Sequence, residues 1–344
     1  MGNPSWKGRG KVNKKAKLLA VASVCGLVVT VLGASSAQAD PSGAPTFRQL
    51  AGVGSDVTGP VMNALSNTIT IGGTKVIGSY DATGSATIAT QSSAACSAIA
   101  RPNGSNAGRA ALIASLEANN GCVQFARSSS LTTTTTGGPQ LTYIPFATDA
   151  VTYAVTSTSN VPRSLTLADL QQIYQCNPAY VGSPGAYTIF PLIPQAGSGT
   201  RSFWETEMGI TDAQVTNGSL PCISDLDSHG NLIEEQNGLV LGDNNLIPFS
   251  IASWDAEESQ AIPDVRGQSV LGVIDGFGSQ AINPSFEVTR SVYNVIPTAD
   301  ENTAPWSTVF NGPSSLICTN LATIEQYGFE QNASCGSTTT VTTP

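Results

Sequence analysis

Residues 194–205 have the sequence PQAGSGTRSFWE, a turn rich in Gly, Ser and Thr that opens directly into a predicted helix. The two glycines allow unusual backbone angles, and Ser198 and Thr200 offer hydroxyls and an N-cap. The first amides of a helix lack intrahelical acceptors, and the helix dipole adds positive potential there. Such an N-terminus accommodates a tetrahedral oxyanion, and Arg201 would add donors beside it. An ordinary capped helix after a loop is the alternative.

Two upstream turns have the same form, a strand that runs through Gly-Ser into a helix. They lie at 54–55 and 104–105, before helices predicted over 57–65 and 109–117 by their apolar spacing. A further run of polar residues, 127–129, follows a short predicted strand. Ligands of α/β folds bind beyond strand ends, near helix N-termini, so these turns together predict a convergent oxyanion site. Chance recurrence of Gly-Ser in a chain rich in both residues is the alternative.

Strands and helices alternate along the chain without a repeat, which favours an α/β architecture. The most strand-like stretch is 141–155, which is long enough to cross from one lobe to another. Further helices are predicted over 165–174, 201–208 and 316–327, and further strands over 50–54, 68–77, 123–126, 187–193, 246–252, 270–274 and 288–296.

The first 39 residues have the composition of a secretory signal. They comprise a basic region, an apolar run and a small-x-small cleavage motif: 7–17, 18–33 and 37–39. Asp40 is therefore the expected mature N-terminus. Val24 stands where lipidation of Cys25 would require a small residue, so we expect secretion without a lipid anchor. No later segment is apolar enough to cross a bilayer, and no membrane insertion is expected.

The expected mature chain is strongly acidic. Removal of the signal takes six of the 15 Lys and Arg residues and none of the 24 Asp and Glu residues, which leaves a formal charge of −15 on 305 residues. This charge argues against nucleic acid and anionic membranes as partners. A chain with one His and no CxxC motif is not expected to hold a metal or another cofactor. We expect a monomer.

Six cysteines remain after the signal, and an even number in an exported chain favours disulfides. Six cysteines allow 15 connectivities. Sequential pairing closes loops within local regions and is our expectation: Cys96 with Cys122, Cys176 with Cys222, and Cys318 with Cys335.

Five motifs recur in the order found in a known family. They are GVGSDVTGP (52–60), PNGSNAGRAALIASLEANNGCVQFARSSS (102–130), YIPFATDAVTYAV (143–155), SLTLADLQQIY (164–174) and PQAGSGTRSFW (194–204). The chain resembles the phosphate-binding components of ABC transporters, class II periplasmic-type solute-binding proteins, as a secreted, actinobacterial-like member. The resemblance implies an α/β fold of two lobes, each a mixed sheet flanked by helices, joined by two crossover strands. The expected division is a signal, lobe I, lobe II, the return part of lobe I and a disordered Thr-rich tail: 1–39, 40–147, 148–248, 249–335 and 336–344.

The resemblance also implies a set of ligand-binding residues. By position in the motifs the family's contacts fall on Asp56 and Val57 and on Ser105, Ser129, Ser198, Gly199 and Thr200. With Ser55 next to the first pair and Arg201 next to Thr200, the predicted set is Ser55, Asp56, Ser105, Ser129, Ser198, Gly199, Thr200 and Arg201. Two positions depart from the family. Pro194 stands where the family has an arginine, so Arg201, or else Arg127, would supply the cationic donor. Ser129 replaces an aspartate that accepts a proton from hydrogen phosphate, and Asp56 could take over as acceptor.

The resulting expectation is a secreted, non-catalytic protein that captures a small oxyanion, phosphate first, with an ABC permease as partner. A secreted structural or surface-interaction protein with the same fold and no ligand site is the alternative. An enzyme comes third, because His229 lies in a polar turn and no G-x-S-x-G elbow is present. Paired carboxylates of a glycosidase, at 205 and 207 or at 234 and 235, are harder to exclude. Asp149 is expected to cap a helix or hold a hinge, with ligand contact as the alternative.

Overall fold

The computed structural model describes residues 40–132, 137–181, 188–277, 282 and 288–342. The expected signal segment, 1–39, lies outside these residues. Among the residues described, no helix is both long enough and apolar enough to span a membrane.

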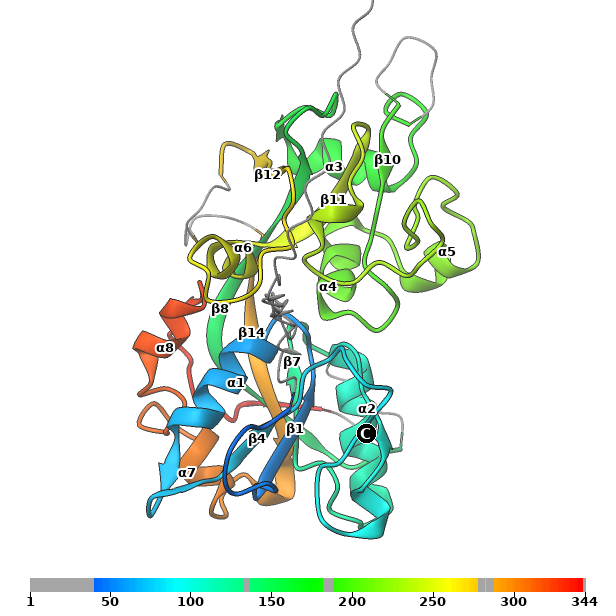
Figure 1. Ribbon diagram of the computed structural model, residues 1–344. Coiled ribbons are helices and arrows are strands. Elements are labelled where there is room, and N and C mark those ends of the chain that lie inside the picture. Colours follow the sequence, from blue (N-terminus) through cyan, green and yellow to red (C-terminus); the bar gives the residue numbers. More distant parts are fainter. Residues whose placement is uncertain (1–39, 133–136, 182–187, 278–281, 283–287, 343–344) are drawn as a thin grey trace, which may run out of the picture. The chain divides into compact units, whose positions relative to one another are not determined.

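A mixed sheet of ten strands organises the described residues (Figure 1). Its path runs in the order β10-β11-β8-β14-β7-β1-β4, and β12, β15 and β16 each pair with β8 as well. The strands are β1 (Leu50–Gly54), β4 (Ile77–Ser79), β7 (Phe125–Ser128), β8 (Leu141–Thr156), β10 (Phe190–Pro191), β11 (Asn245–Ser250), β12 (Ser269–Leu271), β14 (Thr289–Pro297), β15 (Glu330–Gln331) and β16 (Thr340–Val341).

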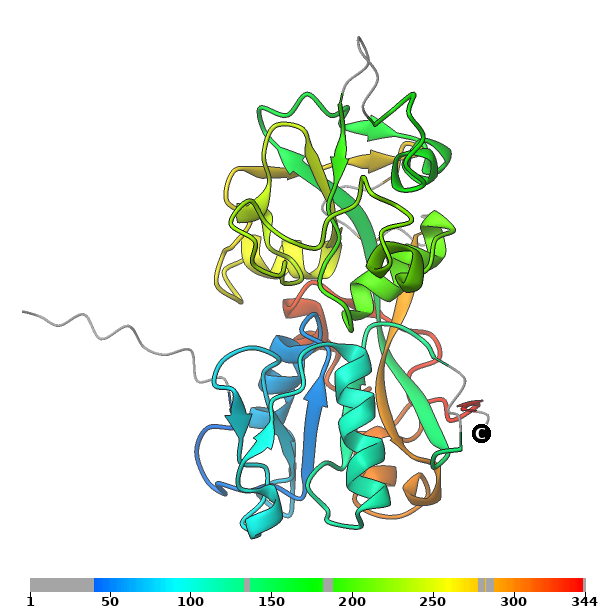
Figure 2. The same cartoon turned by 90° about the vertical axis from the view of Figure 1, so that its right-hand side faces the viewer.

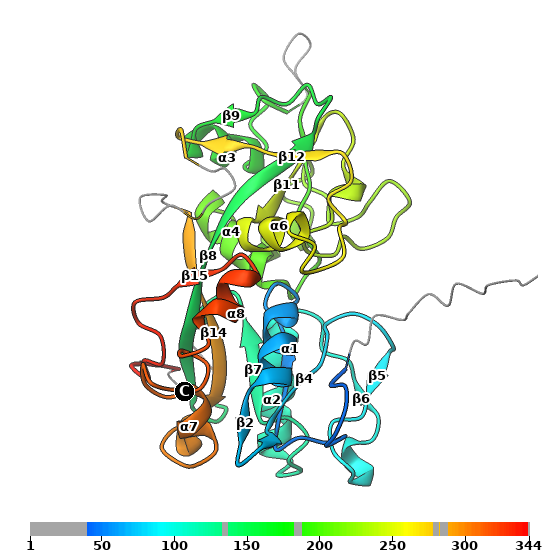
Figure 3. The same cartoon turned by 60° about the vertical axis from the view of Figure 1, so that its left-hand side comes forward.

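Strand β8 connects two groups of strands and has the role expected of 141–155. Its residues 141–150 pair with β14, and its residues 151–156 pair with β11 and β12. Figure 2 shows β8 (green) and β14 (orange) running together, and Figure 3 shows β11 and β12 at the far end of β8. Almost every residue of β8 is buried, as expected of a strand covered on both faces. The fold is the expected α/β class, with β8 and β14 as the two crossover strands.

Helices α1 (Gly59–Thr68) and α2 (Ser105–Glu117) cover opposite faces of β1, β4 and β7. Successive strand residues point to opposite faces, so Leu50 packs in one apolar cluster with α1 while Ala51 packs in another with Leu112 of α2. Gly108 of α2 lies against the end of β1, and a Cβ there would come within 2.4 Å of Gly54 Cα. This close approach places the start of α2 directly beyond β1.

The strands around the second half of β8 carry their own helices. Helix α3 (Leu167–Tyr174) begins with a capping box from Thr166, and α4 (Gly199–Met208) begins with the expected N-cap, Ser198, whose hydroxyl accepts from the N–H of Arg201. Helix α6 (Ile251–Glu258) follows β11 directly. The remaining elements are short: β2 (Thr70–Ile71), β3 (Thr74–Lys75), β5 (Thr87–Ile88), β6 (Ile99–Ala100), β9 (Ser164–Leu165), β13 (Val273–Ile274), α5 (Asp212–Thr216), α7 (Trp306–Phe310) and α8 (Leu321–Gln326).

Two expected boundaries need revision. Strand β12 pairs with β8 at 154–156, and β13 pairs with β9, so residues 249–274 associate with the segment 148–248. These pairings favour a return to the first group of strands at β14, near residue 288, rather than after 248. The expected disordered tail, 336–344, instead contains β16, which pairs with β8 as far as its described residues extend. Buried Thr342 accepts from the N–H of Leu141, so backbone pairing orders this Thr-rich segment.

All three expected disulfides are present, and they join Cys96 to Cys122, Cys176 to Cys222, and Cys318 to Cys335. Their Cα atoms lie 5.1, 5.6 and 5.9 Å apart, within the range that a disulfide requires.

Candidate functional site

Three serines from separate parts of the chain meet at one point. Strands β1 and β7 are parallel neighbours, so Ser55 and Ser129, which follow them, emerge side by side. The Ser55 hydroxyl donates to the Ser129 hydroxyl over 3.2 Å, and the Oγ atoms of Ser129 and Ser105 lie 3.4 Å apart. The N–H of Ser129 donates to Ser105 Oγ over 3.1 Å. All three residues are buried.

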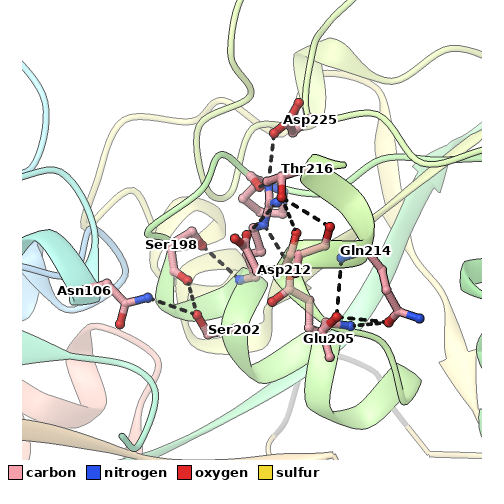
Figure 4. Close-up of polar contacts among 12 residues, drawn as sticks. Asn106, Ser198, Ser202, Glu205, Asp212, Gln214, Thr216 and Asp225 are labelled. Carbon is pink, nitrogen blue, oxygen red and sulfur yellow. Dashed lines mark hydrogen bonds and ion pairs between the residues drawn. The ribbon is translucent and has the colours of Figure 1, made fainter. Parts of the chain in front are cut away.

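The turn before α4 packs against this group of serines. A Cβ added to Gly199 would lie 2.2 Å from both Ser105 Oγ and Ser129 Oγ, so only glycine fits here. The N–H of Asn106 donates to the carbonyl of Gly197 over 3.2 Å, and its side-chain amide donates to Ser202 (Figure 4). The structure thus brings together the turns at 54–55, 104–105 and 197–198, together with Ser129. We call Ser55, Ser105, Ser129, Ser198, Gly199 and Thr200 the serine cluster.

A carboxylate occupies the start of α4 in this structure. Glu235 Oε1 accepts from the hydroxyl of Ser198 and, over 3.2 Å, from the backbone N–H of Thr200. Glu235 is only 5% exposed. The sequence indicated Glu235 only as half of a carboxylate pair. Its position here depends on the fold, because 35 residues separate it from Thr200.

Arg290 of β14 is a buried cation that the sequence analysis missed. Its guanidinium donates through Nη2 to Thr200 Oγ1 over 3.1 Å, and through Nε and Nη2 to Asp149 Oδ2 over 3.0 and 2.8 Å. Asp149 also accepts from the N–H of Ala252 in the first turn of α6, whose N-cap is Ser250, so it binds a helix start as one of its two expected roles required. The only sequence signal for Arg290 is that it is a basic residue in a predicted strand whose other residues are apolar or uncharged polar.

Arg201 faces away from the serine cluster and toward acidic side chains. Its guanidinium forms ion pairs with Glu205, Asp212 and Asp225 at 2.9, 2.7 and 2.9 Å. It also donates to the carbonyl of Pro194. Desolvation raises the pKa of Glu205 to about 7 even though Arg201 opposes that shift. These contacts occupy the guanidinium, so we revise the expectation that Arg201 supplies the cationic donor.

Arg127, the other expected cation, is fully buried beneath the serine cluster. It donates to the carbonyls of Gly52, Gly54 and Ser55, and to the Ser79 hydroxyl. Burial lowers its pKa to about 10. Its donors therefore hold the end of β1 in place, so we assign Arg127 a structural role.

Asp56 lies next to Ser55 and also lines a cavity of about 240 Å³ with Asp81 and Tyr327. Burial raises the pKa of Asp56 to about 8, and repulsion from Glu235 and Glu234 adds to the shift. Asp56 is consequently protonated at neutral pH and has an O–H to donate. A neutral acid beside the serine cluster does not repel an anion.

The structure gives the enzymatic alternatives little support. His229 is 82% exposed on a turn, and Glu234 binds the side-chain amides of Asn103 and Gln195. Trp204 and Trp254 are buried and pack edge-on against Tyr174 and Phe249. In the described part of the chain, no group of His, Cys, Asp and Glu is arranged to hold a metal ion.

Comparison with known proteins supports the fold. No protein-family model matches the sequence, and no curated protein matches it. A solved structure from Clostridium perfringens, assigned as a phosphate ABC transporter substrate-binding protein with bound phosphate, is similar at 16% identity and a TM-score of 0.52. The similarity covers 82% of this chain and 99% of that one. An ABC-type phosphate transport receptor from Vibrio cholerae is similar at 17% identity and a TM-score of 0.50, covering 82% of this chain and 100% of that one. The chain therefore has the two-lobe class II periplasmic-binding-protein fold.

Proposed function

We propose that this chain is a secreted, non-catalytic solute-binding protein that captures a small oxyanion, phosphate first, at the serine cluster. Hydroxyls and helix N-terminal amides from four separate segments would surround the ligand. Neutral dipoles at contact distance can hold an anion even in an acidic protein, because their local potential outweighs that of distant charges. In this proposal Arg290, rather than Arg201, is the nearby cation.

One observation carries the proposal: the start of α4 already binds a negatively charged oxygen. The Glu235 carboxylate accepts hydrogen bonds from the Thr200 N–H and the Ser198 hydroxyl, which are the groups that an external oxyanion would use. Ser105 and Ser129 lie against Gly199 and would complete the coordination. The similar protein from Clostridium perfringens holds phosphate, which makes phosphate the first ligand to test.

The fold suggests how capture would occur. Proteins with two lobes joined by crossover strands close around a ligand by a hinge motion. Here the connections are β8 and β14, and Arg290 links both of them to the start of α4. Delivery to an ABC permease is part of the proposal and rests on the resemblance alone.

Calorimetry on the mature chain, residues 40–344, tests this function. We expect one saturable site for phosphate. Because neutral Asp56 can donate a hydrogen bond to phosphate or to sulfate, sulfate is measured alongside as the second oxyanion. Ser105→Ala combined with Ser129→Ala should weaken phosphate binding by at least tenfold, because two hydroxyl contacts are lost. Ser97→Ala is the matched control, since this serine is exposed and its hydroxyl bonds only locally to Ala94. Absence of binding by any oxyanion would favour the structural alternative.

A further inference from the structure

Glu235 occupies the α4 N-terminus by a defined set of contacts. Its neighbours hold the segment against the turn before α4: the N–H of Gln195 donates to the carbonyl of Ile233 over 2.9 Å, and the Gln195 side chain donates to Glu234. The Glu235 side chain then reaches Ser198 and Thr200. The segment 233–235 is therefore held at Gln195, before the helix, and at Ser198 and Thr200, where the helix begins.

Only one of the two carboxylate oxygens is satisfied. Oε2 of Glu235 has no hydrogen-bond partner within the described residues, although only 5% of the residue is exposed. A buried carboxylate oxygen without a donor is unfavourable. Glu235 is therefore bound at the helix start but incompletely solvated there.

An external oxyanion cannot share this position. The Thr200 N–H is a single donor, and Glu235 Oε1 already accepts from it. An anion at hydrogen-bonding distance from Thr200 would also lie close to the Glu235 charge in a site with little water, where like charges repel strongly. The incoming anion and the Glu235 side chain are thus mutually exclusive.

We propose that Glu235 is an internal carboxylate ligand of the α4 N-terminus, which an external oxyanion must displace in order to bind. This inference rests on the proposed function for the identity of the competitor. Glu235 thereby sets the affinity of the site: it fills the site when no ligand is present and excludes anions that bind too weakly to replace it.

The test uses the mature chain and three variants, E235Q, E235A and, as control, E234Q. E234Q removes the same charge from the same loop, and residue 234 contacts Asn103 and Gln195 instead of α4. The glutamine carbonyl can still accept hydrogen bonds from these amides, so the loop stays anchored in this control. E235Q keeps the shape of the side chain and loses the charge, which weakens its hold on the helix start. We expect phosphate to bind E235Q at least tenfold more tightly than the unsubstituted chain, and E234Q to change the affinity by less than threefold.

Acetate provides a second measurement that does not depend on phosphate. In E235A the carboxylate is gone, so acetate should bind at the α4 start and raise the melting temperature of that variant, with no comparable effect on the unsubstituted chain or E234Q. Sodium chloride at equal ionic strength is the blank. If E235A does not fold, formate and acetate binding to E235Q takes its place.

The outcomes separate the two proposals. Acetate rescue of E235A without phosphate binding to any variant supports the role of Glu235 and overturns the proposed oxyanion function. Phosphate binding of equal or lower affinity in E235Q overturns the role of Glu235 and leaves the oxyanion function intact. If neither acetate nor phosphate binds any of these proteins, both proposals fail.

Discussion

Arg290 and Asp149 form a buried ion pair between the two crossover strands, with Nε and Nη2 of Arg290 both donating to Asp149 Oδ2. Asp149 is fully buried, and its other oxygen accepts from the Ser250 hydroxyl and from the N–H groups of Ala150 and Ala252. Arg290 extends to Thr200. The pair therefore joins β8, β14, α6 and the start of α4.

Loss of this pair should destabilise the fold strongly. Asp149→Ala leaves the Arg290 charge buried without a partner, and we expect the free energy of unfolding to fall by about 3–5 kcal/mol. Urea denaturation followed by circular dichroism measures the change. Asp264→Ala is the matched control, because Asp264 pairs with Arg266 but its side chain is 50% exposed, and its removal should cost less than about 1 kcal/mol. Similar losses for the two variants would contradict the assigned role of Asp149.

Arg201 should prove to be a stabilising residue and not a ligand contact. Arg201→Ala leaves three carboxylates facing one another without their cation, so we expect a loss of about 3–5 kcal/mol in unfolding free energy. Adding Glu205→Gln should recover part of that loss. Calorimetry at low temperature, where the variant stays folded, should show phosphate affinity within twofold of the unsubstituted chain. Retained stability with lost binding would restore Arg201 as the cationic donor.

The pKa of Asp56 predicts how stability depends on pH. Its folded value of about 8 lies above the ordinary 3.8, so between these values the folded state retains a proton that the unfolded chain has released. Stability should therefore fall as the pH rises from about 4 to about 8, by up to about 1.4 kcal/mol per pH unit from this group. Asp56→Asn should flatten the slope in melting experiments. Asp264→Asn should not, because the pKa of Asp264 is already lowered to about 2.

Ionisation of Asp56 should also affect ligand binding. Once the pH exceeds about 8, Asp56 becomes negative and repels an anion at the adjacent serine cluster. We expect phosphate affinity to decline above that pH in the unsubstituted chain and to decline less in Asp56→Asn. Calorimetry at pH 6.5 and 9 measures both. An identical decline in the two proteins would remove Asp56 from the site.

The close contact at Gly199 makes a prediction about non-additive substitutions. Gly199→Ala places a Cβ 2.2 Å from two hydroxyl oxygens, so the turn and the serines must move apart, at a cost of about 1–3 kcal/mol. In a background of Ser105→Ala and Ser129→Ala those oxygens are absent, and the same change should cost less than half as much. Unfolding measurements on the four proteins of this cycle give the coupling. An unchanged cost would mean that the start of α4 does not press on the two serines.

The disulfide that closes the longer loop should contribute more to stability, although the contribution grows only with the logarithm of loop length. The Cys176–Cys222 bond spans 46 residues, and the chain-entropy estimate for such a loop is about 4 kcal/mol. The Cys318–Cys335 bond spans 17 residues, for which the estimate is about 3 kcal/mol. Paired Cys→Ser substitutions compared by urea denaturation test the order. A larger loss at Cys318–Cys335 would contradict this account and indicate an effect on the folded state.

Local patterns predicted many of the elements, but not helix α6, whose first residues fall within a predicted strand. The strand-like stretch 141–155 predicted β8, and the Gly-Ser turn at 197–198 predicted the start of α4. The turn at 104–105 lies at the start of α2, although that helix was predicted only from 109. An even number of cysteines, paired in sequence order, gave the three disulfides that formed. Each of these features depends on residues close together in the chain, or on pairing within one region. The Thr-rich end was misjudged because its order comes from pairing with β8, about 200 residues away.

The distant partners of the charged side chains were decided by the tertiary structure. Arg201 lies beside Ser198 in the sequence, yet the fold brings Asp212 and Asp225 around it and turns its donors away from the serine cluster. Arg290 and Glu235 lie far from Thr200 along the chain, and only the packing of β14 and of the 233–237 segment brings them to the start of α4. A helix start can be recognised from its own sequence, because capping is local. Which charged side chain lies at that helix start depends on distant segments, because electrostatic contacts depend on distance in space and not on distance along the chain.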